Sequence, residues 1–246
     1  MSMHPREEEI ERLIARLVPD APQGWIGATP EDIAAIEANA GRSLPPFYLW
    51  FLTRMGRHMG ALDYVTLDFS VERILSCYRE ELEEPDPRYL LIGYQSDPIV
   101  PMHVWYDLDR PSRGDALVVS RAIGDDLVQH DFETLREMLA YKLMLNYRLP
   151  ALRARCRGEI STDGSDVRAR LERAIAGLRF EQPVPTGSYC GLFDRPDAAL
   201  VCRSSPDGGE DDVLFFSLAA DSPGALRRIL GVITRKTGLH VEIDNA

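Results

Sequence analysis

Residues 29–56 read TPEDIAAIEANAGRSLPPFYLWFLTRMG and predict two short helices joined by a Leu-Pro-Pro segment. Thr29 can cap the first helix with its hydroxyl, and Pro30 suits the first helical position. The acidic side chains that follow favour the positive end of the helix dipole. Gly41 readily takes the left-handed conformation that ends many helices. The first helix is therefore expected over residues 29–41.

The second helix is expected to follow Pro45 and to end near Gly56. A proline at this place is compatible with the first helical turn, and glycine is a common stop signal. The large apolar residues recur at the spacing of one helical face: Phe47, Trp50, Phe51 and Met55. Two short helices, the second strongly aromatic, are thus predicted to meet at the proline pair.

This pair of helices, with Trp25 and Gly27 just upstream, resembles the SUKH superfamily. Members of that family carry a tryptophan-glycine element, an acidic helix, a Leu-Pro joint and an aromatic helix that ends in glycine. The resemblance covers roughly residues 25–147 and continues through the strand-like runs LDYVTLDF, YLLIGY, HVWYDL and ALVVS. It implies an α+β domain that binds another protein. Most bacterial members are immunity proteins that neutralise toxins, often nucleases, and some relatives are regulatory or scaffolding modules.

The rest of residues 1–150 predicts a small, mainly antiparallel sheet flanked by helices. The first twenty residues have a helical apolar stripe, and Ser70 can cap another helix that follows an alternating segment at 65–69. Three strand-like runs lie between turn-rich segments: residues 89–94, 103–108 and 116–120. Asp131 is expected to cap a last helix over residues 132–149. Together these elements predict one SUKH-like domain over residues 1–150.

Beyond Pro150 the sequence predicts a linker at residues 151–164 and a second, smaller α+β unit at 165–246. The linker prediction rests on a basic stretch that turns into a run bearing Gly and Ser. The second unit shows a helical stripe, three strand-like runs, a helix opened by Ser222 and Pro223, and a terminal strand. Its family is not indicated by any motif. The chain as a whole is expected to have an α+β fold.

Charge is distributed unevenly along the chain. Residues 1–150 hold 15 Lys and Arg against 25 Asp and Glu, whereas residues 151–246 hold 13 against 14, so the two parts carry about −10 and −1. A negative first part disfavours direct binding of nucleic acid, which requires clustered positive charge. A basic protein is the more natural partner, although an acidic surface also serves solubility alone.

Composition favours a soluble, cytoplasmic protein without a membrane segment. No run approaches the roughly 20 apolar residues that cross a bilayer, and the N-terminus is acidic where a signal peptide would be basic and then apolar. The four cysteines form no CxxC pair, so they are expected to be ordinary, mostly buried thiols in a reducing compartment. No oligomeric state is indicated.

No catalytic or metal-binding pattern is present in the sequence. The five histidines lack the helical spacing of a zinc site, and no HExxH, GxSxG or phosphate-binding glycine loop occurs. His103 and Asp107 could form a pair, but a strand-edge histidine beside a turn carboxylate is the simpler interpretation. The three tryptophans are expected mainly in the core. We therefore expect no enzyme activity, no cofactor and no metal, and an unrecognised hydrolase is the least favoured hypothesis.

Two acidic segments are the candidate partner-binding residues. Both are expected to be exposed, one in REELEEPDP at the end of a helix and one in YDLDRP at the end of a strand. They comprise Glu80, Glu81, Glu83, Glu84, Asp86, Asp107 and Asp109. They are either a solvated face or a negative surface that attracts a basic partner. The leading hypothesis is an immunity protein that blocks the active site of a basic toxin domain such as a nuclease, and the alternative is a regulatory or scaffolding module for a cellular partner other than a toxin.

Overall fold

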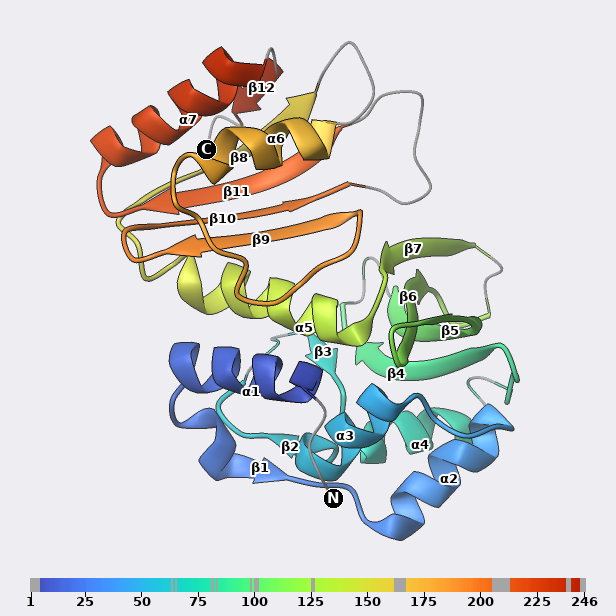
Figure 1. The fold of residues 1–246 in the computed structure, drawn as a ribbon. Coiled ribbons are helices and arrows are strands. Elements are labelled where there is room, and N and C mark those ends of the chain that lie inside the picture. The colour runs from blue at the N-terminus through green and yellow to red at the C-terminus, as the bar shows by residue number, and fades with distance from the viewer. Residues whose placement is uncertain are drawn as a thin grey trace. The chain divides into compact units, whose positions relative to one another are not determined.

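The computed structural model describes residues 5–62, 64, 66–80, 82, 84–97, 99, 102–124, 127–161, 167–204, 213–237 and 240–243. Within these ranges it contains seven α-helices and twelve strands in three antiparallel sheets, which confirms the α+β class (Figure 1). Contacts divide the chain into two compact units, residues 1–138 and 139–246. The boundary falls inside one helix, α5.

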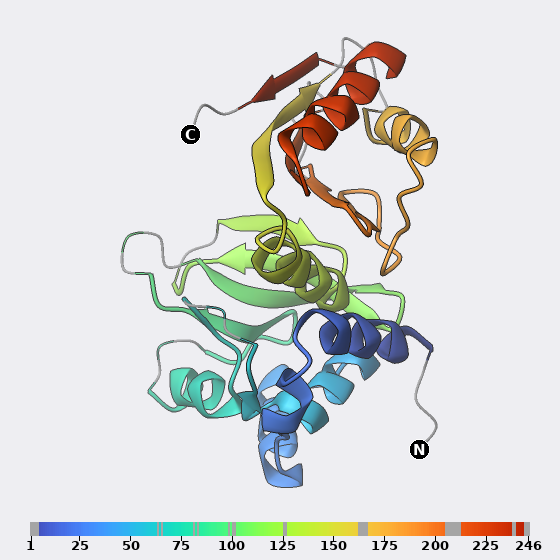
Figure 2. The ribbon, with the colours of Figure 1, turned by 90° about the vertical axis from the view of Figure 1, so that its left-hand side faces the viewer.

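The first unit holds a five-stranded antiparallel sheet in the order β3-β4-β5-β6-β7, and a separate pair, β1-β2. Figure 2 shows helices α1 to α4 gathered along one side of the larger sheet. Its elements are α1 (Pro5–Leu17), the short 3-10 helix η1 (Ala21–Gly24), β1 (Trp25–Ile26), α2 (Pro30–Ala40), α3 (Pro46–Met55), β2 (His58–Met59), β3 (Leu67–Asp68), α4 (Val71–Arg79), β4 (Tyr89–Gln95), β5 (His103–Ser112), β6 (Asp115–Arg121), β7 (Val128–Phe132) and α5 (Leu135–Leu143).

The two helices predicted from residues 29–56 are present as α2 and α3. A capping box starts α2, because Thr29 Oγ1 accepts a hydrogen bond from Asp32 N at 3.2 Å while Thr29 N donates to Asp32 Oδ2 at 2.9 Å. Gly41 ends the helix in the left-handed conformation with φ 63°. Upstream, Gly27 lies so close to α3 that a Cβ atom there would fall 2.2 Å from Thr53 O. The observed cap at Thr29 and stop at Gly41 confirm the predicted boundaries of the first helix.

The aromatic helix α3 packs on the sheet face that we call the inner face. Tyr48 meets Tyr106 of β5 edge to face, with 5.3 Å between ring centroids. Side chains alternate along a strand, so Trp105 and Asp107 of β5 lie on the opposite, outer face. The four aromatic and apolar residues expected on one face of α3 are all buried, as are Ile10, Leu13 and Ile14 of α1. The inner face therefore carries the core of the first unit.

The helix predicted over residues 132–149 is shorter than expected, and Asp131 does not cap it. Asp131 lies in β7, where its carboxylate accepts a hydrogen bond from the Ser120 hydroxyl of β6. Pairing with β6 keeps residues 128–132 extended. The helix begins at Leu135 behind Thr134, whose Oγ1 accepts from Glu137 N at 3.1 Å, and a π-helical turn follows it at Met144–Arg148.

The second unit is a five-stranded antiparallel sheet in the order β12-β8-β11-β10-β9. Its elements after α5 are β8 (Ala154–Ser161), α6 (Val167–Ala176), β9 (Cys190–Arg195), β10 (Ala198–Arg203), β11 (Leu214–Ala220), α7 (Pro223–Thr237) and β12 (His240–Ile243). Apolar residues of α6 and α7 form one buried cluster with alternate residues of the strands. The predicted helices and strands of this unit are present.

The stretch predicted as a linker, residues 151–164, contains an interior strand instead. Strand β8 pairs with β11 on one side and with β12 on the other. Its arginines and Glu159 are exposed and alternate with residues that face the helices, such as Ile160. The basic part of the predicted linker is therefore the exposed face of an amphipathic strand, and residues 162–164 lie outside the described residues.

The four cysteines are free thiols, as the composition predicted. Cys77, Cys190 and Cys202 are buried and Cys156 is partly buried, and none forms a disulfide. Burial raises the pKa of the Cys156 and Cys202 thiols to about 11, so both stay protonated near neutral pH. In the described part of the chain, no helix is both long and apolar enough to cross a membrane.

Candidate protein-binding surface

The predicted acidic segment after α4 forms an exposed turn. Ser70 caps α4 by accepting from Arg73 N at 3.3 Å, and the helix ends at Arg79. Beyond it, Glu80, Leu82 and Glu84 are exposed, with Leu82 at 42% of its maximal area. Glu81 and Glu83 lie outside the described residues. We call Glu80, Leu82, Glu84 and Asp86 the acidic turn.

Asp86 closes the acidic turn and starts the next strand. Its Oδ1 accepts hydrogen bonds from Arg88 N at 2.7 Å and from Tyr89 N at 3.4 Å. An aspartate that accepts from the backbone two and three residues ahead fixes a turn. Asp86 is accordingly half-buried, and part of its role is to position Arg88 at the entrance of β4.

Asp107 was expected to be exposed, and the structure contradicts this. It is fully buried on the outer face of β5, because the guanidinium of Arg88 covers it. Arg88 Nε and Nη2 lie 3.2 Å and 2.9 Å from the two carboxylate oxygens. The register places Tyr89 of β4 directly opposite Asp107, which brings the preceding arginine over the carboxylate. Asp107 therefore holds Arg88 and is not itself available to a partner.

Asp109 is exposed, as expected, but it is also paired. Its side chain keeps 55% of its accessible area and lies 3.0 Å from Arg42 Nη2. Arg42, in the loop between α2 and α3, also donates to Leu108 O at 3.3 Å. The amide of Asp109 donates to Asp107 Oδ1 at 3.2 Å. Asp86, Arg88, Asp107 and Asp109 thus form one hydrogen-bonded chain that links the two predicted acidic segments.

Aromatic rings and arginines outside the two predicted acidic segments lie around Arg88. The Arg88 guanidinium carbon is 4.7 Å from the centre of the Tyr89 ring, and that of Arg121 is 5.5 Å from it. Arg121 also lies 5.0 Å from the ring of Trp105, whose indole Nε1 donates to Arg121 O at 3.0 Å. Only the cross-strand register brings these residues together, so spacing along the sequence gives no signal for them.

The histidines that could have been catalytic have structural hydrogen bonds. His103 Nδ1 accepts from Gln95 N at 3.0 Å, and its ring lies 4.6 Å from that of Tyr94. Desolvation, aided by the charge of Arg73, lowers the pKa of His103, so its ring is neutral at pH 7. Asp107 is held by Arg88, so the imagined His103–Asp107 pair does not form. His58 Nδ1 accepts from Gly60 N at 3.0 Å.

A cavity of about 230 Å³ lies at the start of α5, on the inner side of the sheet. Phe47, Asp115 and Arg136 are among its lining residues. Arg136 is buried and lies 3.1 Å from Glu9 of α1. Asp115 accepts from the Tyr106 hydroxyl at 2.6 Å, and burial raises its pKa to about 6. Each charged group named here already has a partner within the fold.

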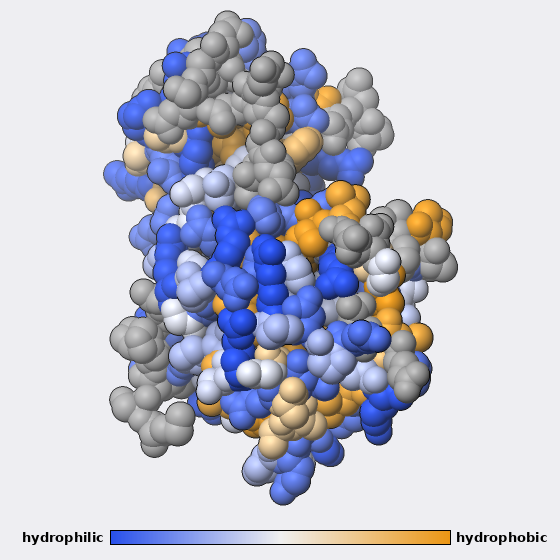
Figure 3. Space-filling model, turned by 90° about the vertical axis from the view of Figure 1, so that its right-hand side faces the viewer, coloured by the Kyte–Doolittle hydropathy of each residue, from blue (hydrophilic) through white to orange (hydrophobic). Residues whose placement is uncertain are grey.

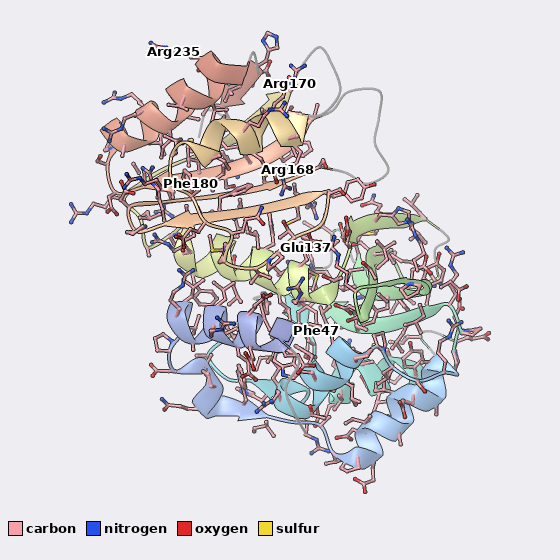
Figure 4. The ribbon with its side chains drawn as sticks, viewed as in Figure 1. Phe47, Glu137, Arg168, Arg170, Phe180 and Arg235 are labelled. Carbon is pink, nitrogen blue, oxygen red and sulfur yellow. The ribbon has the colours of Figure 1, made fainter. Side chains whose placement is uncertain are left out.

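The charge contrast seen in the sequence is sharper when it is counted by compact unit. Residues 1–138 contain 13 basic and 25 acidic residues, a net −12, whereas residues 139–246 contain 15 and 14, a net +1. Arginines such as Arg168, Arg170 and Arg235 lie on α6 and α7 of the second unit (Figure 4). The surface in Figure 3 is mainly hydrophilic, with smaller hydrophobic patches.

Within the described ranges, no group of three or more His, Cys, Asp or Glu side chains is placed to hold a metal ion. A scan of protein-family models found none that matches this chain, and a search of the curated proteins found no match either.

Proposed function

We propose that this chain is a non-catalytic immunity protein that neutralises a cognate bacterial toxin, such as a nuclease, by covering its active site. The observation that carries the proposal is the acidic turn: Glu80, Leu82 and Glu84 are exposed on a unit with a net charge of −12. The resemblance of residues 25–147 to the SUKH superfamily supports the same function.

Electrostatics explains why such a turn suits a nuclease. An enzyme that binds a phosphate backbone presents clustered Lys and Arg, and exposed carboxylates can take the place of the phosphates. Opposite net charges also speed the encounter of two proteins, more than they raise intrinsic affinity. Leu82 adds an apolar group between the acids, which supplies area that loses water on contact. The acidic turn can therefore attract a basic partner and also bury apolar area against it.

Co-expression with a toxin domain encoded next to this chain tests the function. We expect cells to survive the toxin when this protein is present, and the two purified proteins to form a complex at micromolar concentration. If the toxin kills equally well with and without it and no complex forms, the proposal is wrong. Binding to a cellular protein other than a toxin would instead favour the regulatory or scaffolding hypothesis.

A charge reversal tests whether the acidic turn is the binding surface. The double variant Glu80→Lys/Glu84→Lys should slow association with the toxin by about tenfold or more at low salt, with a smaller loss at high salt. Glu8→Lys/Glu31→Lys makes the same charge change at exposed positions of α1 and α2 and serves as the matched control. An equal effect of both variants would show steering by net charge alone and would remove the turn from the proposal. Stopped-flow fluorescence measures the association rates.

A further inference from the structure

The exposed side of α7, in the second unit, carries three arginines. The opposite side of the helix belongs to the buried apolar cluster of that unit. Arg227, Arg228 and Arg235 are exposed, and within the described residues no hydrogen bond or ion pair joins their guanidinium groups to another side chain. Figure 4 shows Arg235 pointing away from the sheet. These cations are therefore open to a ligand of opposite charge.

The sequence of α7 provides no acidic neighbour for its arginines. The helix reads PGALRRILGVITRKT, with four basic residues and neither Asp nor Glu. In α6 of the same unit, by contrast, Arg168 lies 2.7 Å from Glu172, one helical turn further on. An acid at that spacing stabilises a helix, whereas like charges on one face destabilise it. The arginines of α7 thus bring no gain in helix stability, which points to a role outside the fold.

A glycine lies at the centre of the three arginines. Gly231 follows Arg227 and Arg228 by four and three residues and precedes Arg235 by four, so all three surround it on one helical face. Glycine is unfavourable in a helix interior. Nothing lies within 4 Å of the place where its Cβ atom would be, and its φ is not positive. Neither packing nor backbone conformation requires glycine here, and its effect is to leave the helix backbone open to close approach.

We call Arg227, Arg228, Gly231 and Arg235 the α7 patch, and we propose that it binds the phosphate backbone of a duplex nucleic acid, independently of the acidic turn. The fork of N–H donors on arginine matches phosphate oxygens. No aromatic residue occurs in α7, so an unpaired base finds no ring on which to stack. The patch also contains no large apolar side chain, which a protein interface or a membrane surface would use.

The negative charge of the chain belongs to the other unit. Residues 139–246 carry a net +1, whereas residues 1–138 carry a net −12. The acidic unit lowers the affinity for any polyanion, so we expect a dissociation constant at the weak end of non-specific binding, about 10–100 μM at physiological salt. This repulsion is the same in every variant that leaves the first unit unchanged. Comparisons among such variants therefore isolate the contribution of α7.

Fluorescence anisotropy with a short labelled DNA duplex tests the proposal on the full chain. The slope of log K against log salt concentration should be about −2.7, since each of three phosphate contacts contributes about −0.9. Two duplexes of unrelated sequence should bind equally, and a single strand of the same length should bind more weakly. No binding at about 100 μM protein in low salt, or tighter binding of the single strand, would contradict a duplex backbone site.

Matched variants separate the α7 patch from general charge. Arg228→Gln/Arg235→Gln should weaken duplex binding by about fivefold or more at low salt and reduce the salt slope by about 2, because two phosphate contacts are lost. Arg155→Gln/Arg173→Gln removes the same charge from exposed positions of β8 and α6 and should change binding less than about twofold. Circular dichroism checks that both variants fold. Equal losses would mean that net charge alone attracts the duplex and would overturn the site.

A substitution at the central glycine separates binding from folding. In Gly231→Leu the new side chain enters open space and favours the helix, so the melting temperature should stay the same or rise. The same side chain blocks the approach of a phosphate to the helix backbone, so duplex binding should weaken by about threefold or more. Unchanged affinity in Gly231→Leu would contradict a phosphate at the centre of the three arginines.

Discussion

The two faces of the first sheet each bury an aspartate, and each stabilises it differently. On the outer face, Asp107 lies under the Arg88 guanidinium with two charge-assisted hydrogen bonds. On the inner side, Asp115 accepts from the Tyr106 hydroxyl at 2.6 Å and from Ala116 N and Arg136 N at 3.0 Å and 3.3 Å. One carboxylate has a full counter-charge, whereas the other relies on a hydroxyl and backbone amides.

The two aspartates also differ in how far their surroundings are exposed to solvent. The Arg88 guanidinium that pairs with Asp107 is half-exposed. The buried carboxylate balances its charge, yet part of the guanidinium still faces solvent. Asp115 is enclosed by β5, β6 and the start of α5, and burial raises its pKa to about 6. The inner face thus buries a carboxylate without a counter-charge, whereas on the outer face the buried carboxylate is matched by a half-exposed guanidinium.

A large effect is expected from removing the counter-charge on the outer face. Arg88→Ala leaves Asp107 buried without a cation, and such losses cost about 3–5 kcal/mol for fully buried pairs. Arg88 is half-exposed, so water can enter the space that its side chain leaves. We therefore expect the free energy of unfolding, measured in urea, to fall by on the order of 2–3 kcal/mol. Adding Asp107→Asn should restore part of that loss. If Arg88→Ala costs no more than Arg42→Ala at the exposed pair, the contrast between paired burial and surface pairing does not hold.

A pH dependence of similar size is expected on the inner face. The pKa of Asp115 is about 6 in the folded protein and 3.8 in its ordinary state, so the folded chain binds the proton more tightly. Stability from this group is fully present below about pH 4 and is lost as pH rises through 6, by on the order of 3 kcal/mol. The variant Asp115→Asn removes this pH-dependent contribution to stability.

Comparing that variant with the parent at each pH isolates the effect of Asp115. Asp32 acts in the opposite direction, since a hydrogen bond from Arg57 lowers its pKa. Between pH 4 and 7 the parent should lose stability relative to Asp115→Asn in urea unfolding. Parallel curves for the two proteins would mean that Asp115 titrates normally and that the inner face bears no such cost.

Local signals in the sequence predicted α2 and the exposed residues after α4 well. The cap at Thr29 and the stop at Gly41 depend on residues within one or two helical turns, and both are observed. Glu80 and Glu84 were expected to be exposed because they follow the end of a helix stripe, and they are. Such features need no knowledge of partners far along the chain.

Features set by pairing across strands could not be predicted in this way. Asp107 is buried because Arg88, 19 positions away, covers it, and only the register reveals this. Asp131 and the residues of β8 were misassigned for the same reason, since pairing with a neighbouring strand outweighed a capping signal and a linker-like composition. The side chains around Arg88 were not predicted because they come from different strands, Tyr89 from β4, Trp105 from β5 and Arg121 from β6.

A smaller effect should follow removal of one hydroxyl on the inner face. Tyr106→Phe keeps the ring in the core but deprives Asp115 of its shortest hydrogen bond, at a cost of about 1–2 kcal/mol in urea unfolding. The same change should raise the pKa of Asp115 further, because a bond to the charged form is lost. Tyr89→Phe on the outer face keeps the stacked ring and should cost less than about 0.5 kcal/mol. Equal costs would contradict the assignment of Tyr106 as a support of Asp115.

The smallest effect is expected at the exposed pair two residues from Asp107. Asp109→Asn removes the charge that faces Arg42 at 3.0 Å, yet both side chains are well exposed, so the loss in urea unfolding should stay below about 1 kcal/mol. Salt should abolish most of that difference, whereas the cost of Arg88→Ala should persist because the Asp107 carboxylate is shielded from solvent. A salt-resistant loss at Asp109 as large as that at Arg88 would mean that the outer face is held by its surface charges rather than by the buried carboxylate beneath them.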